Sequence, residues 1–584
     1  MKQTLQMITD DDLDYGIQYE KIFIHQFFKK FKNSKKNNSI DYHWNNHDKL
    51  KKDYEYLESF GKKLLDDISS FLNKFHKVNY SNLYWEIIIG DWLHSFCFRI
   101  FDRYEILNSL NYDKFNYVSK FKKFSDKDMI IQSTDEQNNI FWLKDYNSYL
   151  FFKIIDTVPT FKRNFSISIE NIKPNEFFFV KEKFNKRKTG FKGTLLNIYK
   201  TLFAKILQNQ KYPLLRSYLG LKDLFLINFK LRQLPSFIPN NYFNCEVNYD
   251  LRKELIIEDK STNDFEKFIY KNIFLFIPVS YLEGFFIEEK KVSKLNLPLS
   301  PKKIFSANMR GKSLLTRYCA NKKEKGSKLI FAVHGGSYGH YDIHFTEKFE
   351  KKISDLYFTW GWKDKKNPKV KPFGIIRPLP KIKKKVNPHF LTMIVPVKTC
   401  FEINFESPIS LIHKNDFHFN PFFKIIDNIN KEIKFKNLLI RFYNRNFGLN
   451  EFEIFNKKYP TIQKDIQQFD YKDLISNTKV FLSPYLGTGY LETLALNIPT
   501  VIFISKKNDY IIRDDIKSYY QNLKKTKIFF DDEIELSNHI NSIWKDPSLW
   551  WNSKKVQDEV KIFTNEFAYI NKDKINNLKN ILTN

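Results

Sequence analysis

One stretch of 26 residues constrains the fold of this chain more than any other: KVFLSPYLGTGYLETLALNIPTVIFI, residues 479–504. It begins with an apolar β-rich run, passes through a loop with two glycines into an amphipathic helix, and ends in a second apolar run after Pro499. This order is that of a βαβ unit and predicts a parallel sheet in an α/β fold. Ligands of such sheets bind beyond the carboxyl ends of the strands, so a binding site is expected at the glycine loop.

The loop and the start of the helix are suited to an anion. Gly487 and Gly489, which flank Thr488, let the backbone approach a phosphate without an intervening Cβ, and the helix N-terminus offers free N–H groups. Glu492 lies off the apolar stripe of the helix, so its carboxylate is a candidate acceptor for a ligand hydroxyl. A tight turn with a solvent-facing glutamate is the alternative, because short glycine motifs often occur without a ligand.

A second loop with paired glycines, His334-Gly335-Gly336, follows the apolar run 328–333. Two glycines at the carboxyl end of a strand can form an anion-binding nest, where the His334 imidazole could act as general base or hydrogen-bond a phosphate oxygen. The alternative is a histidine that packs on its own loop. Three metal-capable side chains follow: His340, Asp342 and His344. Their irregular spacing matches no ligand pattern, so no metal is expected.

Two more features are candidates for ligand contacts. Arg441 closes the apolar strand 438–440, where a guanidinium suits phosphate or carboxylate, and its alternative is an interdomain salt bridge. Trp360 and Trp362 flank a glycine after another predicted strand and could stack on a sugar or a base. Core packing at a strand end is the alternative for both indoles.

Length and composition place the chain among multidomain globular proteins. It has 584 residues, too many for one core, and its 42% hydrophobic content argues against disorder. The beginning of the chain has no apolar signal segment, and no apolar window is uninterrupted enough to span a membrane. The four cysteines are scattered without a CxxC pair: Cys97, Cys245, Cys319 and Cys400. We therefore expect a cytoplasmic protein without disulfides or zinc.

The net charge of +30, from 96 basic and 66 acidic residues, has two explanations. A positive field favours anionic partners such as nucleotide-sugars, lipid headgroups or nucleic acid. The excess is mostly lysine, however, and asparagine, isoleucine and phenylalanine are also abundant, as in proteins encoded by AT-rich genomes. Composition leaves both explanations open.

The pattern of elements along the chain predicts three regions. Residues 1–125 are expected to be mainly helical, whereas 126–385 and 386–584 should form α/β domains that face one another across a cleft, the second ending in helices. A lysine-rich, proline-flanked linker joins the two domains. Two short stretches, 139–142 and 149–155, look β-like.

Several motifs together resemble a family of bacterial transferases encoded in surface-polysaccharide loci, with the two-domain GT-B-like architecture of many glycosyltransferases. In order they are Tyr84-Trp85, Gly90-Asp91-Trp92-Leu93, Asp102-Arg103-Tyr104, Ser306-Ala307-Asn308, His334-Gly335-Gly336 with Tyr338-Gly339, Trp360-Gly361-Trp362, Arg441 with Gly448, and Gly487 to Glu492 with Asn497 and Pro499. The chain departs from the family pattern at Asp91, where a proline is frequent, and at Val333, where a glutamine is frequent.

The resemblance implies a metal-independent transferase without a cofactor, whose substrates are a nucleotide-sugar donor and a glycan or lipid-linked acceptor. Glu492 and its helix would hold the donor's phosphates and ribose, His334 would lie near the reacting phosphate, and Arg441 would stabilise the leaving group. For such an enzyme, peripheral contact with the cytoplasmic face of the inner membrane is one option beside a purely cytoplasmic location. A glycerol- or ribitol-phosphate transferase or a nucleotide-sugar epimerase is the alternative on the same fold. A nucleic-acid-binding protein ranks below both, because the lysines are dispersed.

Overall fold

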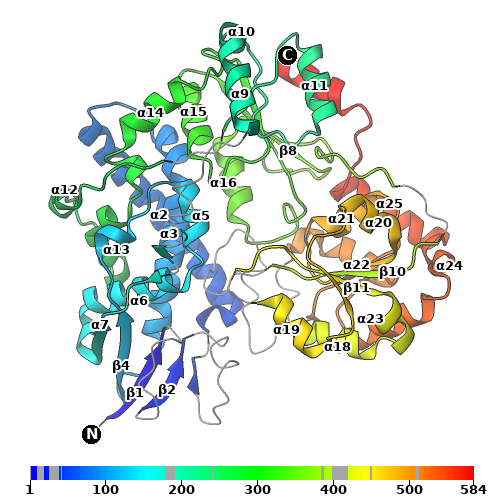
Figure 1. The fold of residues 1–584 in the computed structure, drawn as a ribbon, viewed down its shortest axis with the longest axis horizontal. Helices are drawn as coiled ribbons and strands as arrows, with labels where there is room; N and C mark the ends of the chain where they lie inside the picture. Colours follow the sequence, from blue (N-terminus) through cyan, green and yellow to red (C-terminus); the bar gives the residue numbers. More distant parts are fainter. Residues whose placement is uncertain are drawn as a thin grey trace.

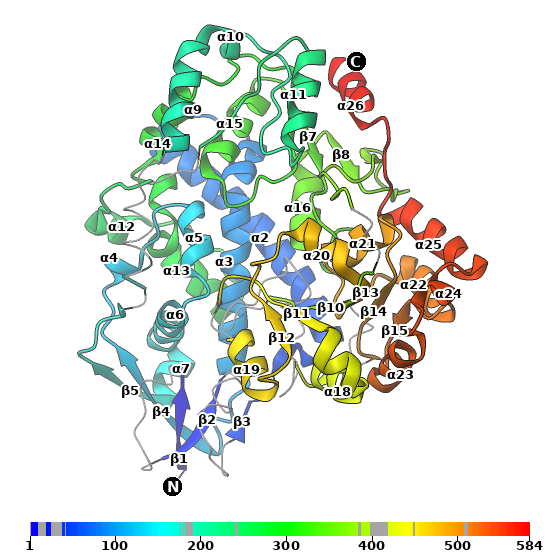
Figure 2. The ribbon, with the colours of Figure 1, turned by 45° about the vertical axis from the view of Figure 1, so that its right-hand side comes forward.

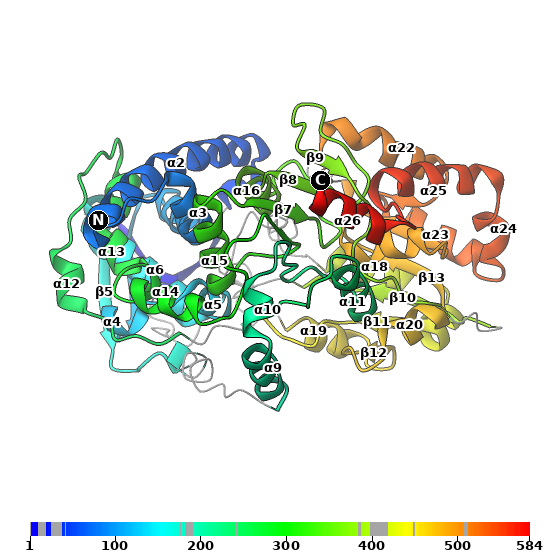
Figure 3. The same cartoon turned by 90° about the horizontal axis from the view of Figure 1, so that it is seen from above.

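The structure of the chain is a computed structural model, shown in Figures 1, 2 and 3. It describes residues 2–9, 19–24, 38–40, 42–175, 177–178, 180, 191–239, 243–382, 387–397, 419–447, 450–506 and 512–584. Gly448 and Cys400, named above, lie outside these residues.

The strands form three separate sheets, and every pairing between named strands is parallel. The five-stranded sheet has the order β3-β2-β1-β4-β5, with β1 Gln3–Ile8, β2 Glu20–Phe23, β3 Asn38–Ser39, β4 Phe115–Lys122 and β5 Phe165–Glu170. The four-stranded sheet runs β6-β7-β8-β9, with β6 Lys303–Ser306, β7 Lys328–Ala332, β8 Leu356–Thr359 and β9 Val370–Pro372. The predicted α/β class with parallel sheets is therefore confirmed.

The six-stranded sheet contains the βαβ unit that the sequence predicted. Its order is β12-β11-β10-β13-β14-β15, with β10 Phe390–Ile394, β11 Leu438–Arg441, β12 Gln463–Asp465, β13 Thr478–Ser483, β14 Thr500–Phe503 and β15 Phe529–Phe530. The chain winds outward from β10 to β12, then crosses back to β13 and winds the other way. The winding reverses between β10 and β13, which is the place where open parallel sheets bind ligands. Helix α21, Thr488–Ala495, follows β13 there.

Helices cover the six-stranded sheet on both sides (Figure 2). They are α18 Asn420–Asn428, α19 Glu451–Lys458, α20 Tyr471–Asn477, α22 Lys517–Lys525, α23 Glu533–Ile543, α24 Pro547–Trp551 and α25 Lys554–Phe567. The core on one side gathers the apolar faces of α18, α19 and α23 against Leu391, Leu438 and Val480. Strand residues buried on both faces explain the continuous apolar runs of the sequence.

A layer of helices separates the five-stranded from the four-stranded sheet (Figures 1 and 3). Its centre is α2 His47–His76 and α3 Asn82–Asn108, joined by α13 Asp264–Phe276, α14 Phe285–Ser293, α15 Ser313–Glu324 and α16 Phe345–Ile353. Helix α3 is buried from Tyr84 to Arg103, which its lack of a polar face requires. Gly90 makes the contact with α16 possible, because a Cβ there would lie 2.9 Å from the Phe349 ring.

The structure corrects the predicted organisation of the N-terminal part. Residues 1–125 contribute four strands as well as α2 and α3, and β4 pairs with β5 across the expected boundary at 125. The stretches 139–142 and 149–155 are not strands, since they lie in or beside α5 Thr134–Ile140 and α6 Lys144–Thr157. Helix α6 is buried on most of its surface, so it lacks the apolar stripe that marks an exposed helix in a sequence.

The end of the chain returns to the four-stranded sheet. After α25 the backbone passes beside the strand ends of that sheet, where Tyr569 N–H donates to the Trp360 carbonyl at 2.8 Å and the Tyr569 carbonyl accepts from Ile375 N–H at 2.8 Å. Helix α26, Lys574–Thr583, then packs Leu578 and Leu582 on the core of this sheet. The last residues therefore do not belong to the 386–584 unit in which the sequence placed them.

Three short helices complete the N-terminal half, α4 Asp126–Met129, α7 Pro159–Asn164 and α12 Tyr249–Glu254. Three further helices gather at one end of the molecule near α26: α9 Phe191–Leu202, α10 Ala204–Gln208 and α11 Leu221–Lys230 (Figures 1 and 2). Within the described residues, no helix is both long and apolar enough to cross a bilayer.

Candidate functional site

The two glycine loops found in the sequence touch each other. The loop after β7 carries His334, Gly335 and Gly336, and the Gly336 N–H donates to the Thr488 hydroxyl at 3.1 Å. A Cβ on Gly336 would lie 2.2 Å from the Gly487 carbonyl oxygen, so the two backbones are as close as glycine allows. The carboxyl edges of the four-stranded and six-stranded sheets therefore meet at these loops.

The rest of the His334 loop is anchored on the six-stranded half. The Tyr341 hydroxyl donates to the Leu486 carbonyl at 3.1 Å, and the His340 carbonyl accepts from Arg513 N–H at 3.0 Å. His340 itself is buried against aromatic rings and shares a 2.8 Å hydrogen bond with the Tyr520 hydroxyl. Burial lowers the pKa of His340 to about 3, so this histidine is a neutral packing residue.

The glycines before α21 serve close packing as well as ligand access. A Cβ on Gly487 would lie 2.2 Å from the Tyr485 ring, and one on Gly489 would lie 2.9 Å from the Phe481 ring. Gly489 thus lets the helix approach the sheet closely. Gly487 is the N-cap residue of α21 and has no side chain that could accept from the first N–H groups of the helix, a role that a bound anion could take.

Glu492 is buried rather than solvent-facing, with 3% of its surface exposed. Its Oε2 accepts from the Tyr471 hydroxyl at 2.8 Å. Its Oε1 lies 3.1 Å from Arg377 Nε, close enough for an ion pair although the angle is not that of a hydrogen bond. Burial raises the pKa of Glu492, and the charge of Arg377 and the Tyr471 hydroxyl oppose that rise.

His334 faces the same arginine. Its ring lies 4.9 Å from the Tyr218 ring and its Nδ1 is 3.4 Å from the Tyr338 hydroxyl. Burial lowers the pKa of His334 to about 4, and the charges of Arg377 and Arg310 act in the same direction. The imidazole is therefore neutral near pH 7, beside two cations. Such a site favours an anion, and the ring also has a hydrogen bond with the backbone of Ala307.

The family motif Gly90-Asp91-Trp92 supports this site from α3. Arg310, on the loop after β6, donates through Nε to Asp91 Oδ1 at 2.6 Å, and Gly311 N–H donates to Asp91 Oδ2 at 3.1 Å. The aspartate at this departure from the family pattern thus fixes the loop that places the Arg310 charge near His334.

The side chain of Glu350 on α16 makes the stability of the fold depend on pH. It is almost fully buried and accepts from the Tyr357 hydroxyl at 3.4 Å. Burial raises its pKa to about 8, from 4.5 when exposed. Between pH 4.5 and pH 8 the unfolded chain has released a proton that the folded protein retains. The free energy of unfolding therefore falls as the pH rises through this range.

Glu350→Gln should remove this loss, and we expect the variant to be more stable than the unsubstituted protein by roughly 2–5 kcal/mol at pH 8 and about equally stable near pH 4.5. Thermal unfolding followed by circular dichroism across this range measures the difference. A gain that stays constant from pH 4.5 to pH 8 would contradict the assignment.

Two predicted contacts are not at the site. Arg441 Nη1 pairs with the buried Asp465 at 2.5 Å and donates to the Phe469 carbonyl at 3.2 Å, so it is held at the β11–β12 side of the sheet. This salt bridge lies within one sheet rather than between domains.

Trp360 and Trp362 are 2% and 4% exposed, and the Trp360 Nε1–H donates to the Val333 carbonyl. Neither indole ring has an exposed face on which a sugar could stack, so both tryptophans are core residues.

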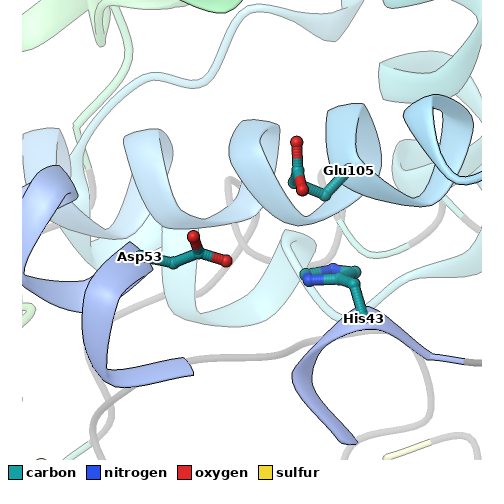
Figure 4. A group of neighbouring side chains, drawn as sticks. All are labelled: His43, Asp53 and Glu105. Atoms are coloured by element: carbon teal, nitrogen blue, oxygen red, sulfur yellow. The ribbon is translucent and has the colours of Figure 1, made fainter. Parts of the chain in front are cut away.

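The residues that could hold a metal lie elsewhere. His344 caps α16, and Asp342 pairs with Lys51 at 2.6 Å. Among the described residues, one group has ligand atoms within 4.8 Å of one another: His43, Asp53 and Glu105 (Figure 4). The Lys49 ammonium contacts both carboxylates of this group, at 2.9 and 2.6 Å. This ammonium already provides the positive charge that a metal ion would supply to the two carboxylates.

A cavity of about 230 Å³ opens at the same edge of the six-stranded sheet. Val395 after β10, Tyr443 and Arg445 after β11, and Glu451 at the start of α19 line it. Only β10 separates it from the N-terminus of α21, since Ile394 of that strand lies against Gly489.

Sequence reasoning missed the side chains that complete the site, namely Arg377, Tyr471, Tyr218 and Arg310. Arg377 stands directly before the proline-flanked stretch interpreted as a linker, residues 378–388. Tyr218 follows no motif, and only the structure brings it to His334, some 116 positions away in the chain. One signal was present: Asn308 belongs to the family motif, and its side chain donates to the Tyr218 hydroxyl at 3.0 Å.

The comparison with protein families gives a match along nearly the whole chain. The model of a family described as LIC12162 family transferase matches residues 16–582. No curated protein matches the chain.

Solved structures give weaker likenesses. The wall teichoic acid polymerase TagF is 12% identical with a TM-score of 0.32, over 70% of this chain and 94% of that one. MurG of Acinetobacter baumannii is 9% identical with a TM-score of 0.32, over 64% and 99%. The pneumococcal O-GlcNAc transferase GtfA is 12% identical with a TM-score of 0.31, over 52% and 60%. Scores this low establish neither a shared fold nor a shared activity.

Proposed function

Since the chain belongs to the LIC12162 family of transferases, we propose that it is a glycosyltransferase that uses a nucleotide-activated sugar to build a cell-surface polysaccharide. The observation that carries the proposal is the meeting of the two glycine loops, which brings His334, Arg377 and Glu492 to one place between two parallel sheets. Two α/β halves that meet at their carboxyl edges are suited to a donor on one side and an acceptor on the other.

The donor would lie on the six-stranded half. Its phosphates would face the free N–H groups of α21 and the Arg377 guanidinium, and its ribose would hydrogen-bond Glu492. The cavity beyond β10 has room for part of the nucleoside. These cationic and N–H groups supply the charge stabilisation that the leaving phosphate needs, so the reaction requires neither metal nor cofactor.

His334 would act as the base. The acceptor hydroxyl oxygen bonds to the anomeric carbon, the bond from that carbon to the donor phosphate breaks, and the proton of the hydroxyl passes to the imidazole. The lowered pKa keeps the His334 ring neutral at physiological pH, so the ring can accept a proton there but cannot act as a cationic phosphate ligand. The acceptor, a glycan or a lipid-linked glycan, would approach beside Tyr218, and the protein would work in the cytoplasm.

A thermal-shift screen against CMP-, UDP-, GDP- and CDP-linked sugars tests the donor site. A donor at a hundred times its dissociation constant should stabilise the fold by about 2.7 kcal/mol. Glu492→Gln should weaken the shift from the correct donor, whereas Glu432→Gln, an exposed glutamate of the same half, should not. No shift with any donor would contradict the proposal.

The products then separate the reactions that this fold could support. Release of free nucleotide only when an acceptor is present indicates glycosyl transfer. Transfer of glycerol or ribitol phosphate from a CDP-linked donor, or an isomerised donor, would indicate the alternatives. A gel shift with nucleic acid at physiological salt would favour the binding protein that the charge of +30 first suggested.

A further inference from the structure

Helix α11 presents an apolar stripe to solvent. Leu221, Phe225 and Phe229 are spaced four residues apart and therefore share one face of the helix, and Leu221 and Phe229 are 70% and 80% exposed. The opposite face buries Leu224 and Ile227 in the core of the four-stranded sheet. The exposed apolar side chains are therefore not part of the core that holds α11 on the sheet.

Helices α9 and α10 extend this apolar surface. Leu195, Ile198 and Leu202 of α9 are all at least half exposed, Leu202 at 73%. The Tyr199 hydroxyl donates to the Pro235 carbonyl at 2.8 Å, which ties α9 to the segment that follows α11. Figures 1 and 3 show the three helices together at one end of the molecule. An apolar face of this extent marks a place where a protein meets a membrane or a partner.

The charge around these helices favours a membrane with anionic lipids. Residues 191–239 contain eight basic residues and a single acidic one, Asp223. The charge of Asp223 is already paired with Lys574 at 2.7 Å. Lys205, Lys222 and Lys230 are exposed beside the apolar side chains. Basic residues that flank an exposed apolar stripe are typical of helices that lie in the interface of an anionic bilayer.

The apolar face is continuous with the candidate site. Tyr218, three residues before α11, packs against His334 with the two rings tilted, and a Cβ on Gly220 would lie 3.2 Å from Pro378, the neighbour of Arg377. Arg216 and Tyr218 both adopt left-handed backbone conformations, with φ of 47° and 59°. Strain of this kind persists only where the surrounding structure enforces it, so α11 and the wall of the site are held in a fixed relation.

We propose that the face formed by α9, α10 and α11 docks on an anionic lipid bilayer and holds the candidate site near its surface. Leu221, Phe225 and Phe229 would enter the boundary between headgroups and acyl chains, and the lysines would contact the headgroups. That the candidate site then receives a lipid-linked acceptor rests on the proposed function; the docking itself does not.

Flotation of the full chain with vesicles tests the docking. The protein should float with vesicles of phosphatidylcholine and phosphatidylglycerol in equal parts, and less with phosphatidylcholine alone. The double variant Leu221→Ser, Phe229→Ser should bind the mixed vesicles at least about tenfold more weakly, because both side chains lose their place in the interface. Lys222→Glu with Lys230→Glu should weaken binding to the mixed vesicles only and make it less sensitive to salt.

The matched control is Ile256→Ser with Leu549→Ser, two side chains that are 82% and 78% exposed but lie outside these helices. This control should bind as the unsubstituted protein does. Absence of flotation with the mixed vesicles would overturn the proposal, and so would equal losses in control and test variants. A dimer that Phe229→Ser abolishes would also overturn it, since the face would then join two copies of the chain.

A separate measurement distinguishes failure of the docking from failure of the proposed function. Flotation uses neither donor nor acceptor, so it can succeed whatever reaction the site catalyses. If transfer is established, the Leu221→Ser, Phe229→Ser variant should retain activity on a water-soluble acceptor and lose it on one embedded in vesicles. Equal loss on both acceptors would overturn the role of this face in presenting the acceptor.

Discussion

Replacing His334 with glutamine is expected to slow transfer by about 10²–10⁴-fold, the usual contribution of a positioned base, while the protein stays folded. Glutamine keeps a polar side chain beside Tyr338 and Tyr218 but cannot accept the proton of the acceptor hydroxyl. Release of nucleotide with acceptor measures the effect in vitro, and loss of surface polysaccharide at unchanged protein level measures it in cells.

The pH profile gives this prediction a second readout. A histidine whose pKa is lowered to about 4 stays neutral over most of the acid range. The acid limb of kcat/KM should therefore lie near pH 4–5 rather than at the ordinary histidine value of about 6.5, and it should disappear in the variant. His389→Gln is the matched control, because this exposed histidine precedes β10 at the opposite edge of the sheet. Full activity in the His334→Gln variant would show that His334 is not the base of the reaction.

Gly336→Ala is expected to have the second large effect. Its Cβ would lie 2.2 Å from the Gly487 carbonyl oxygen and 2.7 Å from Thr488 Cα, and both are backbone atoms that cannot turn aside. The two loops must separate by about 1 Å, a misplacement that commonly costs about 10²-fold in rate. The overpacking should also lower stability by about 1–3 kcal/mol.

The neighbouring glycine is the control for Gly336. A Cβ on Gly335 would meet a single atom, the Thr488 hydroxyl oxygen, at 3.3 Å. Gly335→Ala should therefore change both the rate and the melting temperature little. Thermal unfolding and the transfer assay on both variants decide the matter. Equal effects at the two positions would show that contact between the loops does not control the site.

Much of the fold could be predicted because its strands are buried on both faces and its loops carry glycines. The strands around residues 330, 357, 440 and 480 all lie where the apolar runs placed them. The five-stranded sheet escaped prediction for a physical reason. Its first three strands are short and separated in the chain from β4 by two long helices, and parallel pairing leaves no local turn signal.

The site was predictable in part for the same reason. His334, Gly336, Gly487 and Glu492 belong to local patterns at strand ends, and the structure brings these loops together. A single sequence does not reveal which partner each charged or polar side chain has in the folded protein. Arg441 looked free at its strand end, but Asp465 on the next strand neutralises it. Arg377 and Tyr218 reach the site through contacts distant in sequence, which no spacing rule detects.

The return of the chain after α25 bears on how the two halves can open. The backbone leaves the four-stranded sheet through residues 373–382 and comes back through 568–573, and the two segments are joined by the hydrogen bond from the Ile375 N–H to the Tyr569 carbonyl at 2.8 Å. Gly361 and Gly374 have φ of 145° and 104°, and the backbone packs directly on both, with the last turn of α25 against Gly361 and Tyr569 against Gly374. Any change in the angle between the two halves would therefore bend these adjacent crossings, and it would also break the contacts that anchor the His334 loop on the six-stranded half.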